Sequence, residues 1–172
     1  MPRDYKREEQ SDDMERESAV NVIDLLKEDH RKVKGLFEKF KAANATSRQS
    51  IADEALQDLE IHTKIEDSIV YPAIRDSIDE EEMMDEAKEE HHVVGLLIKE
   101  LRKMKATKDG YQAKFTVLSE LVEHHIEEEE SEMLPQAEES LDLEDLGKQV
   151  MEMKARLSSG RKRSSSSRRQ AA

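Results

Sequence analysis

Two histidine–glutamate pairs in the sequence have the spacing that places two side chains on one face of a helix. His62 is followed four residues later by Glu66, and His125 is followed four residues later by Glu129. Residues four positions apart are neighbours on a helix surface, so each pair can direct an imidazole and a carboxylate toward one point. Imidazole and carboxylate together suit iron, manganese or zinc. The two pairs therefore predict a metal site.

Two further histidines, His30 and His91, make these pairs part of an internal repeat. The segments HTKIEDSIVYP, from His62, and HIEEEESEMLP, from His125, both read histidine, three residues, glutamate, five residues, proline. The motifs EDH and EEH end at His30 and His91, and each is followed three residues later by valine. The repeat predicts two similar helical hairpins packed face to face, each with one histidine on its first helix and a histidine–glutamate pair on its second.

We predict that these residues meet as one ligand set of four imidazoles and two carboxylates. A buried carboxylate must be neutralised, paired or bound to a metal ion, and no lysine or arginine lies on the inward stripes. Each glutamate can bridge two ions, so the set suits a dinuclear centre with two histidines per metal and positions left for water, hydroxide, oxo or a diatomic ligand. The predicted ligands are His30, His62, Glu66, His91, His125 and Glu129.

Four amphipathic helices must position this set, and apolar residues recurring in steps of three and four predict them. The first is expected after Ser18 and ends at AANATSRQS, and the second begins near Ser50. The third begins around Glu80 and ends at TKDG, and the fourth begins near Tyr111. Short connections between them favour an all-α, up-down four-helix bundle over residues 18–140.

The helical register decides which side chains face inward. It selects His91 over His92 and His125 over His124, and the two unselected histidines are expected to flank the site. The inward stripe of the second helix is predicted to be Ala55, Leu59, His62, Glu66, Ile69 and Ala73.

Prolines and tails define the limits of the bundle. Pro72 and Pro135 are expected to kink or end the second and fourth helices. Residues 1–17 form a charged N-terminal arm, and residues 141–157 form an additional short helix that can dock on the bundle. Residues 158–172, SSGRKRSSSSRRQAA, form a basic tail rich in Ser and Arg, which is predicted to be disordered because it has nothing apolar to bury.

Composition narrows the class of protein. The 172 residues suffice for one domain with tails, 40% are charged, and glycine and proline number five and three, which favours helices over strands. The net charge of −13 argues against binding of nucleic acid or anionic membranes by the body. The absence of cysteine excludes disulfides, thiolate metal sites, iron–sulfur clusters and cysteine nucleophiles. With no secretory signal and no apolar run long enough for a bilayer, a soluble cytoplasmic protein is expected.

Four motifs together identify a family resemblance over roughly residues 20–138. DHRKVKGLFEKF, HTKIEDSIVYP, EEHHVVGLLIKEL and HHIEEEESEMLP resemble the hemerythrin family in its bacterial HHE cation-binding form. The resemblance implies an up-down four-helix bundle around two non-haem iron ions, a di-iron centre with an oxo or hydroxo bridge. It also implies that the six residues predicted above are the metal ligands.

The sequence departs from the oxygen-carrying members of this family in two places. Gly95 stands where those proteins have a fifth histidine, one turn after His91. Their fourth-helix carboxylate lies one residue further from its histidine, a place that Glu130 could take. Tyr71, five residues after Glu66, is a candidate ligand or a packing residue. The departure resembles the sensor, iron-responsive and redox-active branch of the family.

Three classes of function follow. The first is a di-iron protein that binds or reacts with O2, peroxide or NO in sensing or stress response. The second is a di-iron peroxidase or catalase-like enzyme, although no separate proton-relay residue is evident. The third is a metal-stabilised interaction module whose basic tail binds an unidentified partner, either nucleic acid or an acidic protein.

Overall fold

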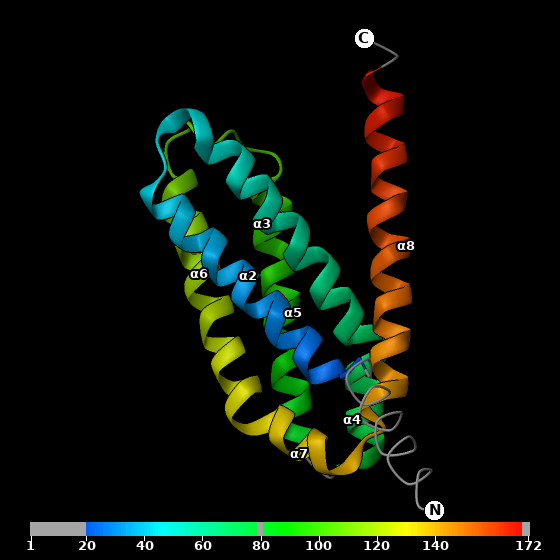
Figure 1. Ribbon diagram of the computed structural model, residues 1–172. Coiled ribbons are helices and arrows are strands. Elements are labelled where there is room, and N and C mark those ends of the chain that lie inside the picture. Colours follow the sequence, from blue (N-terminus) through cyan, green and yellow to red (C-terminus); the bar gives the residue numbers. More distant parts are fainter. Residues whose placement is uncertain (1–19, 79–80, 170–172) are drawn as a thin grey trace, which may run out of the picture.

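Four long helices form the body of the protein (Figure 1). The computed structural model describes residues 20–78 and 81–169. The four helices are α2 (Val22–Ala42), α3 (Ala45–Ile65), α5 (Glu81–Leu101) and α6 (Tyr111–Glu128). Helix α2 packs on α3 and α5 on α6, and the two hairpins meet through α2 against α6 and α3 against α5. The predicted all-α four-helix bundle is confirmed, and the described residues contain no strand.

The second long helix begins earlier than the sequence predicted. It starts at Ala45 and not near Ser50. Asn44 caps it, because its side-chain Oδ1 accepts hydrogen bonds from the backbone N–H groups of Thr46 and Ser47, both at 3.1 Å. An asparagine at this position satisfies N–H groups that otherwise have no partner. The segment interpreted as a break therefore contains the cap and the first turn of α3.

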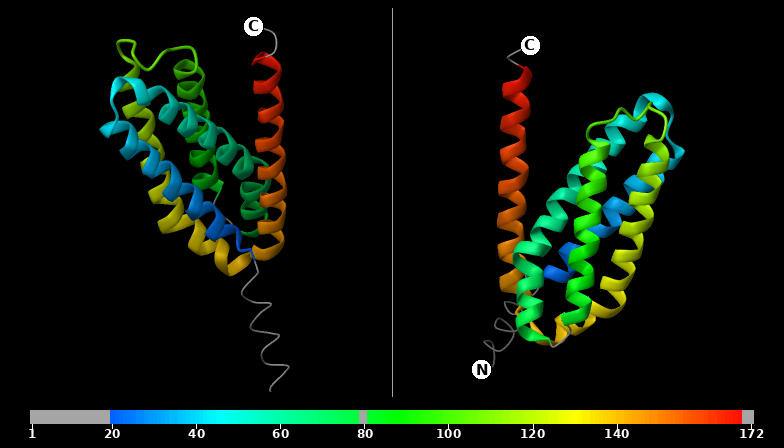
Figure 2. Two further views of the ribbon diagram at one scale, coloured as in Figure 1. Left: turned by 45° about the horizontal axis from the view of Figure 1, so that its top comes forward. Right: turned by 180° about the vertical axis from the view of Figure 1, so that it is seen from behind.

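In each hairpin the second helix runs on into a short further helix (Figure 2), and one π-helical turn that begins at the glutamate joins the two. The elements are η1 (Glu66–Val70) followed by α4 (Tyr71–Ser77), and η2 (Glu129–Met133) followed by α7 (Leu134–Ser140). In each π turn the residue before the proline donates its N–H to the glutamate carbonyl five residues earlier. Pro72 and Pro135 have no N–H and would clash with a carbonyl in a regular helix. The wider turn accommodates them, so they do not end the helices.

The π turn changes which side chains face inward after it. Ile69 and Ala73, predicted on the inward stripe, are only partly buried. Tyr71 and Ile74 are buried in their place. A turn with one additional residue rotates the following helix relative to the preceding one. The predicted stripe is therefore wrong beyond Glu66, and Tyr71 points toward the centre.

Apolar side chains fill the bundle on both sides of the polar centre. Along α2, Leu26 belongs to one apolar cluster and Phe37 and Phe40 to the other, and a buried histidine lies between them in the sequence. Within the second cluster, Phe40 stacks on Phe115 with ring centroids 3.9 Å apart. Two apolar layers thus separate the polar centre from water at both ends of the bundle.

Helix α8 (Leu143–Arg169) is longer than the predicted additional helix of 141–157. Its first turns dock against α2 and α3 through buried Leu146 and Val150, and its C-terminal half projects away from the bundle (Figure 1). The backbone is helical through Arg169, where the sequence predicted a disordered tail. A docked helix adds one backbone hydrogen bond per residue as it extends, and apolar burial is not required for this continuation.

None of the described helices has the length and apolar content needed to cross a membrane. The predicted N-terminal arm, residues 1–17, lies outside the described residues.

Gly147 lets α8 approach the chain that leads into α2. A Cβ atom at this position would lie 2.0 Å from the carbonyl oxygen of Val20. We expect Gly147→Ala to force the two segments apart and to lower the free energy of unfolding by about 1–3 kcal/mol. Gly35→Ala is the matched control, because a Cβ there meets no atom within 4 Å and the change favours the helix by up to about 1 kcal/mol. Urea unfolding followed by circular dichroism measures the free energy of unfolding of both variants. If Gly147→Ala were as stable as Gly35→Ala, the close approach at Gly147 would be contradicted.

Candidate metal centre

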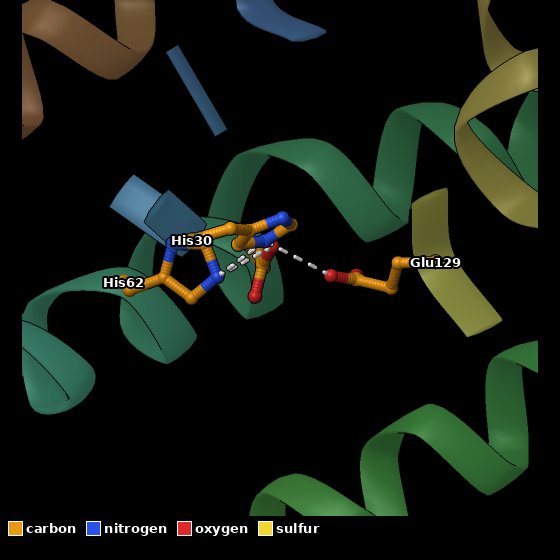
Figure 3. A group of neighbouring side chains, drawn as sticks. His30, His62 and Glu129 are labelled. Carbon is orange, nitrogen blue, oxygen red and sulfur yellow. Dashed lines mark hydrogen bonds and ion pairs between the residues drawn. The ribbon is translucent and has the colours of Figure 1, made fainter. Parts of the chain in front are cut away.

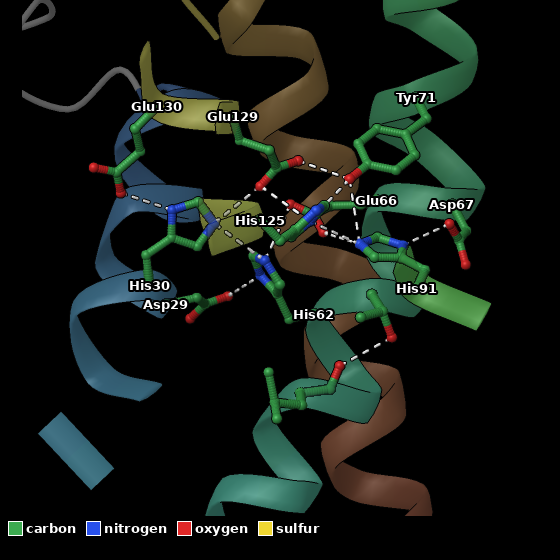
Figure 4. Close-up of polar contacts among 12 residues, drawn as sticks. Asp29, His30, His62, Glu66, Asp67, Tyr71, His91, His125, Glu129 and Glu130 are labelled. Carbon is green, nitrogen blue, oxygen red and sulfur yellow. Dashed lines mark hydrogen bonds and ion pairs between the residues drawn. The ribbon is translucent and has the colours of Figure 1, made fainter. Parts of the chain in front are cut away.

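All six residues predicted as ligands lie together at the centre of the bundle (Figure 4). Each long helix contributes one histidine, and each π turn begins with one of the two glutamates. Their exposed fractions lie between 0% and 7%. By helix, the residues are His30 on α2, His62 on α3, His91 on α5, His125 on α6, Glu66 on η1 and Glu129 on η2.

The first group of candidate ligand atoms comes from α2, α3 and both π turns (Figure 3). The Nε2 atoms of His30 and His62 are 3.2 Å apart. His62 Nε2 lies 3.1 Å from Glu66 Oε1, and His30 Nε2 lies 3.4 Å from Glu129 Oε2. Two imidazoles and two carboxylates therefore face one point.

The second group comes from α5 and α6 and shares the same glutamates. The Nε2 atoms of His91 and His125 are 3.0 Å apart. His91 Nε2 lies 3.3 Å from Glu66 Oε2, so Glu66 presents one oxygen to each group. Glu129 Oε2 lies 3.6 Å from His125 Nε2 and also faces His30 in the first group. The two groups are therefore adjacent and linked by both carboxylates.

Tyr71 adds a hydroxyl to the second group. This oxygen lies 3.2 Å from His91 Nε2 and 3.3 Å from His125 Nε2. The hydroxyl donates a hydrogen bond of 2.7 Å to Glu129 Oε1. The sequence left open whether Tyr71 was a ligand or a packing residue, and its oxygen is now placed among the candidate ligands. The π turn that brings it there had no sequence signal beyond the proline that follows.

Carboxylates face the outer nitrogens of the histidines in a pattern that follows the repeat. His91 Nδ1 lies 2.9 Å from Asp67, and His30 Nδ1 lies 2.8 Å from Glu130. Asp67 and Glu130 each follow the bridging glutamate of the opposite hairpin by one residue. Glu130 was considered from the sequence as a replacement metal ligand. In the structure it contacts His30 Nδ1, the ring nitrogen that faces away from the centre.

The second-helix histidines face acids of their own hairpins. His125 Nδ1 forms a hydrogen bond of 2.6 Å with Glu90. His62 Nδ1 lies 3.7 Å from Asp29, which is too long for a hydrogen bond, and this nitrogen is buried without a partner. Asp29 and Glu90 are the acids directly before the first-helix histidines. A carboxylate that accepts the Nδ1 proton leaves the Nε2 lone pair free for a metal ion. The acids in EDH and EEH were visible in the sequence, but their role requires the packed hairpins.

The histidines that the register excluded lie on the surface. His92 and His124 are both exposed. His124 Nε2 pairs with Glu128 Oε1 at 3.3 Å, four residues along the same helix. The adjacent histidines of each pair are therefore separated into one that faces the centre and one that faces solvent.

The unpartnered atoms of the centre fit a metal site. Both side-chain oxygens of Glu66 and Oε2 of Glu129 are buried without a hydrogen-bond partner. Four imidazole Nε2 atoms converge on these oxygens, and buried anionic oxygens without donors are costly. Cations between the nitrogens and the carboxylates would satisfy both.

In metal-free protein, protons would take the place of these cations. Burial lowers the pKa of His62, but Glu66 and Asp29 outweigh it and raise that pKa from 6.5 to about 10. Burial also lowers the pKa of His91, and contacts with Asp67 and Glu66 raise it to about 9. Burial raises the pKa of Glu66, whereas His62 and His91 bring it well below 4.5. Metal binding must therefore displace protons from the imidazoles.

Comparisons by sequence and by structure find proteins that resemble this chain. The hemerythrin HHE cation binding domain matches residues 21–137. The chain is 34% identical over 118 residues to the uncharacterized protein Rv2633c of Mycobacterium tuberculosis, covering 67% of this chain and 71% of that protein. It is 29% identical over 132 residues to an uncharacterized hemerythrin-like protein of Schizosaccharomyces pombe, covering 73% of this chain and 64% of that protein.

A solved structure has a similar fold. The crystal structure of a hemerythrin HHE cation binding domain-containing protein from Mycobacterium kansasii, a homolog of Rv2633c, matches with a TM-score of 0.69 and 30% identity. The match covers 80% of this chain and 87% of the other.

Protonation of the centre makes the stability of metal-free protein depend on pH. The folded-state pKa values of His62 and His91 lie above the unfolded value of 6.5, so the folded protein binds more protons between pH 6.5 and about 9. We expect the free energy of unfolding to fall by about 1.4 kcal/mol per pH unit for each histidine in this window. Urea unfolding of chelator-treated protein at a series of pH values measures the slope.

Two variants test the origin of that slope. His62→Gln should reduce it, whereas His92→Gln, which changes an exposed histidine on α5, should leave it unchanged. A slope that survives in His62→Gln would mean that other groups carry the pH dependence.

Proposed function

The chain belongs to the hemerythrin HHE cation-binding domain family, and on this premise we propose that it holds two non-haem iron ions that react with O2, peroxide or NO. One observation carries the proposal: two groups of buried imidazoles share Glu66 through its two oxygens. A dinuclear centre needs such a bridge, and a single ion would leave two histidines unused. A cytoplasmic role in sensing or stress response accompanies this proposal.

The residues that would hold each ion follow from the two groups. The first ion would take His30, His62 and Glu66, with Glu129 Oε2 also facing it. The second would take His91, His125 and Glu66, with the hydroxyl of Tyr71 beside them. Two histidines and a carboxylate at each position form the set typical of non-haem iron sites that react with oxygen. The hydroxyl of Tyr71 could supply a ligand atom at the second position, where Gly95 has no side chain that could bind the ion.

When bound, two iron ions would supply electrons and open positions for a small oxidant or NO. The protein's own residues orient and protect that chemistry. The outer carboxylates fix the histidine rings, and the apolar clusters keep bulk water away. Tyr71 holds a proton on its hydroxyl, directed at Glu129 Oε1, inside the centre.

The proton on the Tyr71 hydroxyl favours the second candidate function, a peroxidase or catalase-like enzyme. Breaking a peroxide bond requires a proton for the departing oxygen, and the sequence offered no evident donor. Burial first, then the charges of Glu66 and Glu129, raise the pKa of Tyr71 well above 10, so the hydroxyl stays protonated in metal-free protein. The position of this proton inside the centre makes Tyr71 the candidate donor for this activity, although the raised pKa also makes the hydroxyl a weaker acid. The partner predicted for the basic tail stays a prediction.

Metal content tests the shared bridge. We expect the purified, iron-loaded protein to hold two iron ions per chain and to show the visible absorption of a bridged di-ferric centre. Glu66→Ala removes a ligand from both groups, so the iron content should fall below one per chain. Glu128→Ala, an acid of α6 that pairs with exposed His124, is the matched control and should retain two. One zinc ion per chain in the purified wild-type protein would overturn the di-iron proposal.

Tyr71→Phe separates ligand and proton-donor roles. If the phenolate binds ferric iron, the variant loses a charge-transfer band while keeping its iron content. If the hydroxyl donates a proton to peroxide, turnover falls by about 10²-fold or more. Tyr111→Phe is the control, because the Tyr111 hydroxyl is also buried but has no hydrogen-bond partner, and the residue lies in the apolar cluster away from the centre. An unchanged spectrum and unchanged turnover in Tyr71→Phe would exclude both roles.

A further inference from the structure

Helix α8 lies beyond residues 21–137, the segment that matches the family, yet it reaches the candidate metal centre. Lys154 of α8 forms an ion pair through its Nζ with Asp29 Oδ1. The other oxygen of Asp29 faces His62 Nδ1 at 3.7 Å. Figure 4 shows Asp29 between α2 and the ring of His62. A chain of three side chains thus connects α8 to a candidate ligand.

This ion pair breaks the symmetry of the two hairpins. Glu90 is the counterpart of Asp29 in the repeat, and it contacts His125 Nδ1 directly at 2.6 Å. No lysine or arginine among the described residues pairs with Glu90. The contact from Asp29 to His62 is more than an ångström longer and is not a hydrogen bond, so the ion pair with its second partner is the shorter contact that fixes Asp29. That partner comes from α8.

A cavity of about 500 Å³ connects the same helix to the buried histidines. Lys154 and Ser158 line it on the α8 side, and His62, His91 and His125 line it at the centre. Between these ends the wall combines apolar side chains with polar ones. The apolar ones include Val33, Leu59, Val94 and Val122, and the polar ones include Lys32, Gln57 and Asp58. The cavity is far larger than a diatomic molecule, and it joins partly exposed residues to side chains that are almost fully buried.

We propose that α8 completes the metal centre, with Lys154 as a positioning residue and the cavity as the entrance for small inorganic ligands. Lys154 holds Asp29 against His62, and Asp29 keeps the ring of His62 oriented with Nε2 toward the metal. The same helix forms the outer wall of the entrance, so its docking controls both ligand access and retention of the ion at the first position. This inference rests on the proposed metal binding, and it adds a helix that the family match does not include.

The test uses full-length, metal-loaded protein and two rates that do not depend on turnover. The first is the rate of metal release to excess chelator, and the second is the rate of azide binding, followed by its visible absorption in stopped flow. Lys154→Met should accelerate metal release by about tenfold or more, the range found when a contact behind a metal ligand is lost. Azide binding should also become faster, because the wall at Lys154 opens.

Control variants separate positioning from general destabilisation. Lys154→Arg retains the charge and should restore both rates to within about threefold of wild type. Lys148→Met removes another lysine of α8, one that pairs only with Glu144 of the same helix, and should leave both rates unchanged. Ser158→Trp fills the outer end of the cavity and should slow azide binding without altering metal content.

Each result supports or overturns one part of the proposal. Metal release from Lys154→Met at the wild-type rate would overturn the positioning role, and unchanged azide binding in Ser158→Trp would overturn the entrance. If Lys154→Met does not fold, Asp29→Asn measures the same contact from the α2 side. Release of Co²⁺ from cobalt-loaded protein gives the same comparison even if the wild-type protein holds no iron, so failure of the di-iron proposal is recognised separately.

Discussion

The fold is organised around the cost of burying two carboxylates that no lysine or arginine reaches from residues 20–78 or 81–169. Glu66 and Glu129 are almost fully enclosed, and three of their four oxygens have no hydrogen-bond donor. Such groups are tolerated only when positive charge is close. Four imidazoles, one from each long helix, surround them and can carry protons or bind cations. The bundle is therefore stabilised when protons or cations are bound at the centre. This couples folding to metal binding and to pH.

The internal repeat builds this arrangement from two similar halves. Each hairpin supplies half of the candidate ligands and half of the acids that contact the histidine rings. The acid before each first-helix histidine contacts the second-helix histidine of its own hairpin. The acid after each bridging glutamate contacts the first-helix histidine of the other hairpin. The two halves are thus tied to each other by the residues that hold the rings, and the group formed by His91 and His125 takes its carboxylate, Glu66, from the other hairpin.

The sequence predicted the helices and the convergence of the six residues, because helical periodicity and the repeat both constrain which face is buried. It left open whether Tyr71 was a ligand or a packing residue, because the inward stripe was extended at regular spacing past Glu66, while the turn before Pro72 contains one additional residue. It missed Asp29, Asp67 and Glu90 as partners because those contacts form only between packed helices. Charged residues at such positions look like ordinary surface residues in a sequence with 40% charge.

The difference between Tyr71 and Leu134 has a consequence for the ions themselves. The two residues occupy the same place in the repeat, but Tyr71 brings a hydroxyl into the centre, whereas Leu134 is a buried hydrocarbon side chain of an apolar cluster. Two ions held in this frame would be chemically inequivalent, with different donor atoms and different affinities. They would fill in a fixed order, and the first electron removed would come preferentially from one of them.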